Sequence, residues 1–146
     1  MSGLREGLRH YQSGAVAIEF AFVFPVFLGI VYAMIAYGLA FLVLQSFTYA
    51  SEEALRAALA HPCDGTCTPE ELEPKVKEQV EATLSWLSVT YVTEATSGDD
   101  FFSCTPENLC TVRLSAGPLI PSLNLPVFGE VPRLPAELVG KASLRM

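Results

Sequence analysis

Four cysteines are the side chains of this chain with the most obvious chemistry, and they come as two local pairs, Cys63 with Cys67 and Cys104 with Cys110. In an oxidising compartment, an even number of cysteines in a small domain indicates disulfide bonds. Three pairings can form, and pairing within each local pair is favoured because both intervals are rich in turn residues. A zinc site of four cysteines is the alternative, although the Cys-x3-Cys and Cys-x5-Cys spacings differ from the usual zinc knuckles.

The residue types that catalysis needs are poorly represented. The two histidines are His10, before a long apolar run, and His61, beside Pro62, so neither can be paired with a nucleophile in a folded domain. Glutamates are numerous over residues 70–81, but carboxylates near the start of a helix are favoured by the helix dipole and are usually solvated. We therefore expect no enzyme activity, no cofactor and no bound metal ion.

A single carboxylate in an apolar setting is the third chemical feature. Residues 15–44 form an apolar run of thirty residues in which Glu19 is the only charge. At about 1.5 Å per residue, this run exceeds the roughly 30 Å hydrocarbon core of a bilayer, which predicts a transmembrane helix. An ionisable group inside a membrane span is costly and is therefore a candidate functional residue. Glu19 also lies near one end of the run, so the alternative is a side chain that simply reaches the interface.

The charges on the two sides of the run predict its orientation. Arg5 and Arg9 precede it, so the positive-inside rule places the N-terminus in the cytoplasm and the following domain outside. That domain, residues 45–146, carries fourteen acidic and seven basic residues, which argues against nucleic acid as a partner. A cleaved secretory signal is the competing interpretation of the N-terminus, but its apolar region is usually shorter, about 7 to 15 residues.

The start of the run resembles the processing site of type IV prepilins. A short basic leader ends at Gly14, a small residue follows at Ala15, and Glu19 stands at the fifth position after the glycine. Within that superfamily, the sequences GAVAIEFAFVFP (residues 14–25) and ASEEALRAAL (residues 50–59) resemble the TadE-like (TadE/TadG) pilin-related proteins of tight-adherence secretion systems. The resemblance is good from about Ser13 to Leu59 and loose beyond.

The resemblance implies a minor pilin or pseudopilin, a membrane-inserted structural subunit for assembly of a tight-adherence (Flp, type IVb) pilus. A prepilin peptidase would cut between Gly14 and Ala15, and Glu19 would act in assembly by meeting the new amino terminus of a neighbouring subunit. The alternative is a single-pass, signal-anchored periplasmic binding or scaffold module that does not enter a filament.

The same resemblance implies partners and a location. The expected partners are the membrane, other pilin subunits, the prepilin peptidase and the inner-membrane pilus assembly platform. The expected location is the bacterial inner membrane, crossed once, with the head in the periplasm; a pilus on the cell surface is the further location.

The element that must position Glu19 is a long helix. No proline or glycine interrupts residues 45–61, so the membrane helix should continue to about Ala60. Pro25 removes a backbone hydrogen bond and predicts a kink, which membrane helices tolerate.

A second helix is predicted from about Thr68. Thr68 is suited to the N-cap, Pro69 to the first helical position and Glu71 to the third, which together indicate a capping box. An apolar stripe follows at helical spacing and should pack on the head. Its members are Leu72, Val76, Val80, Leu84 and Leu87.

The rest of the head is expected to be mainly β. Residues 88–94 and 111–115 are rich in β-branched and aromatic side chains and are predicted to be strands, with a polar loop over 96–108 between them. Residues 117–135 hold five of the ten prolines, so an extended apolar connection is expected there and no central strand. Residues 137–146 alternate loosely and are predicted to close the sheet as a terminal strand.

Together these patterns predict an α+β fold. A long N-terminal transmembrane α-helix, kinked near Pro25, continues into a small extracytoplasmic head with one further helix and a small antiparallel sheet. The predicted divisions are a basic leader (1–14), a transmembrane segment (15–44), a continuation of the same helix (45–61) and the head (62–146).

Overall fold

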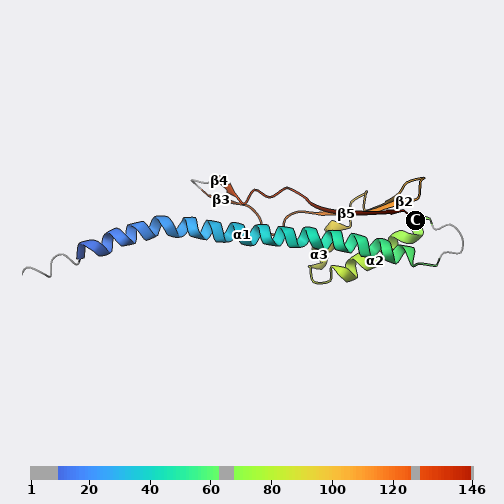
Figure 1. Cartoon of the computed structure of the whole chain (residues 1–146), viewed down its shortest axis with the longest axis horizontal. Coiled ribbons are helices and arrows are strands. Elements are labelled where there is room, and N and C mark those ends of the chain that lie inside the picture. Colours follow the sequence, from blue (N-terminus) through green and yellow to red (C-terminus); the bar gives the residue numbers. More distant parts are fainter. Residues whose placement is uncertain (1–9, 63–67, 126–128, 146) are drawn as a thin grey trace, which may run out of the picture.

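The largest element of the fold is one very long helix. The structure, a computed structural model, describes residues 10–62, 68–125 and 129–145. Helix α1 (His10–Leu59) has 50 residues and is therefore about 75 Å long. This confirms the predicted single helix, which begins at His10, ahead of the expected start at Ala15. α1 continues unbroken through Pro25, and Figure 1 shows that it bends in its N-terminal half, which contains this proline.

The second helix begins as the capping residues predict. α2 (Pro69–Thr83) follows Thr68, whose backbone amide donates a hydrogen bond to the Glu71 carboxylate at 3.3 Å. The predicted apolar stripe of α2 is also confirmed, because Leu72, Val76, Val80 and Leu84 are buried and Leu87 packs partly buried against the same core.

The segment predicted as a strand at residues 88–94 is helical, so that prediction is wrong. Helix α3 (Val89–Ala95) begins after Ser88, whose hydroxyl accepts a hydrogen bond from the backbone amide of Tyr91 at 3.3 Å. Val92 and Ala95 lie one turn apart on the same side and are both buried. The N-cap and this burial outweigh the β propensity of the segment, which is a weak and context-dependent preference.

The main sheet has three antiparallel strands in the order β1-β2-β5. They are β1 (Phe102–Cys104), β2 (Leu109–Ala116) and β5 (Leu138–Arg145). β2 and β5 confirm the two strands predicted in these regions. β1 lies within the predicted polar loop, so the loop prediction is wrong for residues 102–104. Three residues are too few to show an alternating pattern, and their strand conformation comes from pairing with β2.

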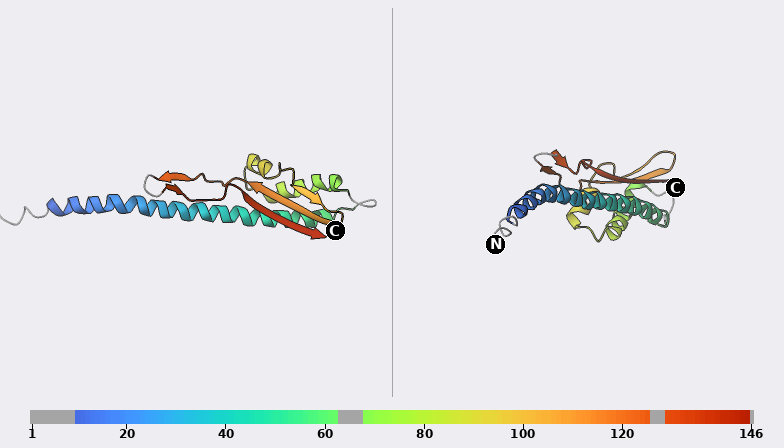
Figure 2. Two further views of the ribbon diagram at one scale, coloured as in Figure 1. Left: turned by 90° about the horizontal axis from the view of Figure 1, so that it is seen from above. Right: turned by 60° about the vertical axis from the view of Figure 1, so that its left-hand side comes forward.

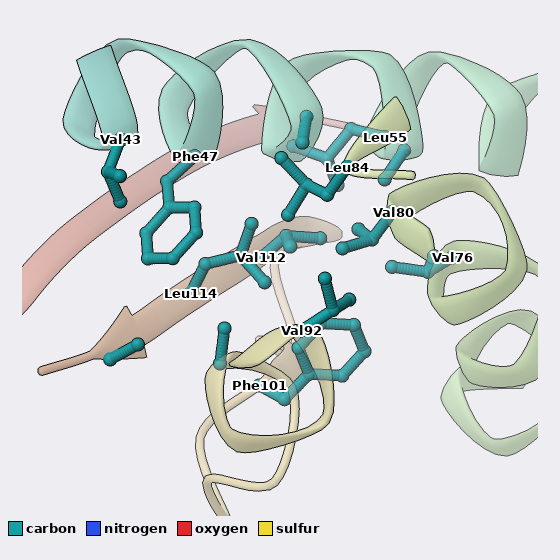
Figure 3. Close-up of a cluster of buried hydrophobic side chains, with 14 of the residues drawn as sticks. Val43, Phe47, Leu55, Val76, Val80, Leu84, Val92, Phe101, Val112 and Leu114 are labelled. Atoms are coloured by element: carbon teal, nitrogen blue, oxygen red, sulfur yellow. The ribbon is translucent and has the colours of Figure 1, made fainter. Parts of the chain in front are cut away.

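All three helices lie on one face of this sheet, which gives the head two layers (Figure 2). Along β2 the buried side chains are Cys110, Val112, Leu114 and Ala116, and the residues between them are more exposed, so one face of the strand holds the core. Both α1 and α3 contact β2 at this face. Figure 3 shows the resulting core, in which side chains of α1, α2, α3 and β2 converge.

The last strand passes unusually close to α1. A Cβ added at Gly140 would lie 2.5 Å from the Cβ of Phe47 and 2.8 Å from the backbone nitrogen of Thr48. Only glycine leaves the space that this crossing of two backbones requires. Gly140 therefore fixes how closely β5 approaches α1, in the middle of the core.

Between β2 and β5 the chain leaves the head and lies along α1 (Figures 1 and 2). This agrees with the extended apolar connection predicted over residues 117–135, which also contains a two-stranded hairpin. The hairpin consists of β3 (Leu123–Leu125) and β4 (Gly129–Val131), paired antiparallel with Leu123 opposite Val131. We call the described part of this segment, residues 117–125 and 129–135, the strap.

Candidate membrane and assembly site

The N-terminal half of α1 presents a continuous apolar surface. Every residue from Gly14 to Leu28 is exposed. The large apolar members are Val16, Ile18, Phe20, Phe22, Val23, Phe24, Val26, Phe27 and Leu28. A soluble protein rarely exposes so large an apolar patch unless the patch binds a partner or a membrane. α1 is also the one helix, among the residues that the structure describes, that is long and apolar enough to cross a membrane.

Glu19 is the only charge on this surface. Ala15 precedes it by one helical turn, so the two residues lie on the same side of α1. Three ion pairs are found among the described residues, and none of them includes Glu19. The structure thus places Gly14, Ala15 and Glu19 together at the exposed end of α1 and leaves the carboxylate open to another molecule.

Burial on α1 begins well before the predicted end of the membrane segment at Leu44. Ala36 is 1% exposed and Ala40, which belongs to the core of the head, is 8% exposed. The side chains at positions 29 and 31–33 are already partly covered. The strap and the head therefore cover one side of α1 within residues 29–44, and the assignment of 15–44 as the membrane segment stays a prediction.

Two tyrosine hydroxyls of α1 hold the strap against the helix. The hydroxyl of Tyr32 donates to the carbonyl oxygen of Pro121 at 2.7 Å, and that of Tyr37 donates to the carbonyl oxygen of Arg133 at 3.5 Å. Sequence reasoning missed this role. The available signal was the presence of two tyrosines within an apolar helix, since a tyrosine hydroxyl in an apolar setting usually has a hydrogen-bond partner.

A third tyrosine holds the beginning of the strap. The hydroxyl of Tyr91, on α3, donates to the carbonyl oxygen of Gly117 at 2.5 Å, and its ring stacks on Phe47 with 6.1 Å between the ring centroids. Partial burial, with a smaller contribution from the negative charge of Glu94, raises the pKa of Tyr91 above its ordinary value of 10.0. The hydroxyl therefore stays protonated and able to donate at neutral pH.

An apolar groove lies between the strap and α1. Its walls on α1 are formed by Pro25, Leu28, Gly29 and Tyr32, and its walls on the strap by Leu123 and Val131. These two strap residues lie opposite each other on β3 and β4, so they share one face of the hairpin. The strap thus turns an apolar face to the same stretch of α1 that the sequence predicts to be in the membrane.

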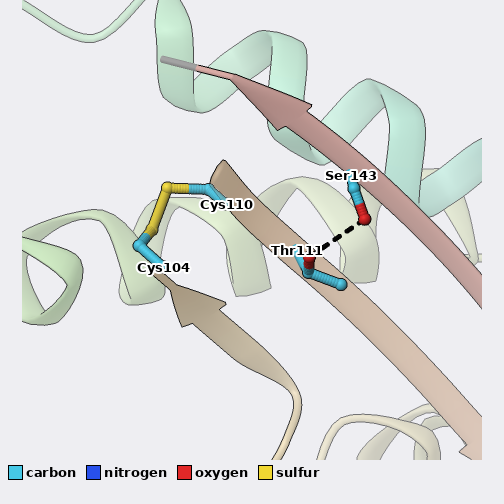
Figure 4. The surroundings of a disulfide bond; sticks show 4 residues. All are labelled: Cys104, Cys110, Thr111 and Ser143. Atoms are coloured by element: carbon cyan, nitrogen blue, oxygen red, sulfur yellow. Dashed lines mark hydrogen bonds between the residues drawn. A yellow bond between two sulfur atoms is a disulfide. The ribbon is translucent and has the colours of Figure 1, made fainter. Parts of the chain in front are cut away.

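One of the two predicted disulfides is present. Cys104 on β1 lies directly opposite Cys110 on β2, with 4.0 Å between the two Cα atoms, and the sulfur atoms are bonded (Figure 4). The hairpin turn between them contains Asn108 at a φ of 60°, a left-handed conformation that asparagine tolerates. A neighbouring hydrogen bond joins the hydroxyls of Thr111 and Ser143 at 2.9 Å across β2 and β5.

This disulfide excludes a zinc site made from all four cysteines, because Cys104 and Cys110 are bonded to each other. Cys63 and Cys67 lie outside the described residues, so the second predicted pairing stays a prediction. No group of three or more histidine, cysteine, aspartate or glutamate side chains is placed to hold a metal ion within residues 10–62, 68–125 and 129–145.

The fold and the exposed surface define a class of protein: a small α+β head carried on one long, apolar N-terminal helix, which suggests anchoring in a membrane. Residues 14–56 match the model of the family described as TadE-like protein, and this confirms the resemblance predicted from the sequence. The family suggests a component associated with a tight-adherence (Tad) pilus. Searches of the curated proteins and of the solved structures found no match to the chain.

Proposed function

We propose that this chain is a minor pilin or pseudopilin of a tight-adherence (Flp, type IVb) pilus. Its exposed apolar helix would hold it in the bacterial inner membrane with the head in the periplasm, and would then pack with other pilin subunits on the assembly platform. The observation that carries the proposal is the combination of the TadE-like match over residues 14–56 with an exposed apolar surface from Gly14 to Leu28 that contains a single charge, Glu19.

Processing and assembly are chemically linked in this proposal. Cleavage by a prepilin peptidase between Gly14 and Ala15 would create a cationic amino group one helical turn from Glu19. In hydrocarbon, a lone carboxylate and a lone ammonium group are each strongly unfavourable, and pairing offsets part of that cost. The pair that drives assembly is formed between subunits: the carboxylate of one meets the amino terminus of its neighbour.

The first test is the N-terminus of the mature protein. N-terminal sequencing and intact mass of membrane-extracted protein should give a chain that starts at Ala15. The control is the same protein expressed in cells without a prepilin peptidase, where the leader should stay attached. A chain that keeps Met1 or Ser2 in the presence of the peptidase would leave the signal-anchored binding module as the better interpretation.

The second test separates assembly from membrane insertion. Glu19→Ala makes the helix more apolar, so membrane levels should be equal or higher, while recovery with other pilin subunits should fall by about tenfold, which corresponds to loss of a charge pair. Glu52→Ala is the matched control, because it removes an exposed carboxylate from the same helix outside the apolar surface. Equal recovery of the wild type and both variants would reduce Glu19 to a side chain that only reaches the interface.

A further inference from the structure

The strap occupies a stretch of α1 that a membrane span would also need. A hydrocarbon core of about 30 Å takes up about 20 helical residues. A span that begins at Gly14 therefore ends near Ala33, and one that begins as early as His10 ends near Gly29. Both spans include Pro25 and Leu28, which line the groove between α1 and the strap.

The strap itself is unsuited to hydrocarbon. Its hairpin has only two strands, so each outer edge carries backbone groups that the described sheet leaves unpaired, and open edges are not tolerated in the bilayer core. Asn124 and Glu130 lie opposite each other on the face that does not line the groove. Glu130 is exposed, and the hydroxyl of Ser122 donates to its carboxylate. Moving these groups into lipid would cost more free energy than the two tyrosine hydrogen bonds contribute.

The groove face of the strap has the opposite character. Leu123 and Val131 face, across the groove, the same apolar stretch of α1 that acyl chains would contact. Lipid and the strap are therefore alternative binding partners of the same apolar surface of α1. Hydrogen bonds from Tyr32 and Tyr37 to the strap backbone favour the strap wherever water surrounds the helix.

We propose that the strap and lipid acyl chains compete for one face of α1 between Pro25 and Tyr37. The strap binds this face when it lies outside the bilayer and is released when the face enters hydrocarbon. Docking of the strap thus reports how deeply α1 sits in the membrane. This inference rests on the membrane insertion of α1 that the proposed function requires.

The test uses the full chain in vesicles of two thicknesses. The photoreactive amino acid benzoyl-phenylalanine replaces Leu28, which is 47% exposed and lines the groove. From this position the probe can react with either the strap or lipid. In vesicles of short-chain dimyristoleoyl phosphatidylcholine, irradiation should give mainly crosslinks to strap peptides. In long-chain dierucoyl phosphatidylcholine, the ratio of strap to lipid adducts should fall by at least about tenfold, because the thicker core draws position 28 into lipid.

Two further variants make the result specific. The same probe in place of Phe22, which is 74% exposed and outside the groove, should give lipid adducts in both vesicles. Tyr32→Phe removes one hydrogen bond to the strap and should lower the ratio at position 28 in thin vesicles by about fivefold.

An equal strap-to-lipid ratio at position 28 in thin and thick vesicles would overturn the competition while leaving insertion intact. Absence of lipid adducts at position 22 would refute insertion itself, and with it both this inference and the proposed function. The two failures are therefore distinguishable in one experiment.

Discussion

Replacing Gly140 with alanine should destabilise the head far more than the same replacement at Gly98 or Gly117. The new Cβ would lie 2.5 Å from the Cβ of Phe47 and 2.8 Å from two backbone atoms of α1, whereas ordinary contacts of a Cβ begin at 3.4 Å. To relieve this clash, the added Cβ and the Cβ of Phe47 must move apart by about 0.9 Å, the difference between 3.4 and 2.5 Å. The neighbouring atoms include backbone, which cannot rotate away as a side chain can. We expect a loss of about 3 kcal/mol in the free energy of unfolding, the upper range for an overpacked core.

The assay is thermal unfolding of the full chain in detergent, followed by circular dichroism and by the fluorescence of Trp86. For a head of this size, about 3 kcal/mol corresponds to a fall in Tm of about 12 to 24 °C. Gly98→Ala is the matched control because nothing lies within 4 Å of its added Cβ, and it should shift Tm by about 4 °C or less. If both variants unfold at the same temperature, β5 does not approach α1 as closely as the structure shows.

Two further predictions concern bonds that hold the head and the strap. Peptide mapping without reduction should recover a Cys104–Cys110 bridge, and free thiols at both positions would contradict the structure. Replacing both cysteines with serine should lower the free energy of unfolding by about 2 kcal/mol, since the bridge closes a short loop. Tyr91→Phe removes the donor to Gly117 and should cost about 1 kcal/mol near neutral pH. Because the pKa of Tyr91 is raised in the folded state, the contribution of its protonated hydroxyl to the free energy of unfolding is present below pH 10.0 and is lost as the pH rises above that value. In urea titrations, the difference in the free energy of unfolding between wild type and Tyr91→Phe should therefore narrow above this pH. A difference that stays constant would contradict the sign of the shift.

The elements that could be predicted from the sequence are those with local signals. α1 follows from its apolar run, α2 from the Thr68 capping residues and its apolar stripe, and β2 from its β-branched residues. α3 could not be predicted from the sequence, because its valines and threonines have strand propensity. What decides its helical conformation is the burial of Val92 against residues far along the chain.

The candidate site was predicted only in part, for the same reason. The exposed apolar helix and the position of Glu19 are properties of the local sequence. The strap was predicted to be extended, but its place beside α1 depends on contacts such as Tyr32 with Pro121, which are 89 residues apart. The sequence does not distinguish Gly140 from other glycines, because the need for glycine in a strand becomes visible only when the partner backbone is known.

Contact between the first and last elements also sets the order in which the head can be completed. The core face of α1, including Phe47, Ala50 and Ala54, is 0% exposed in the finished molecule, and part of its cover is β5 at the opposite end of the chain. During synthesis, α1 and α2 are available long before residues 138–145 exist, so the part of this face that β5 covers stays exposed until those residues have been made. Such long sequence separation slows folding and prolongs exposure of apolar surface. A chain truncated before β5 would carry a complete α1 beside an unfinished head, and the exposed apolar face of α1 would distinguish it from the intact chain.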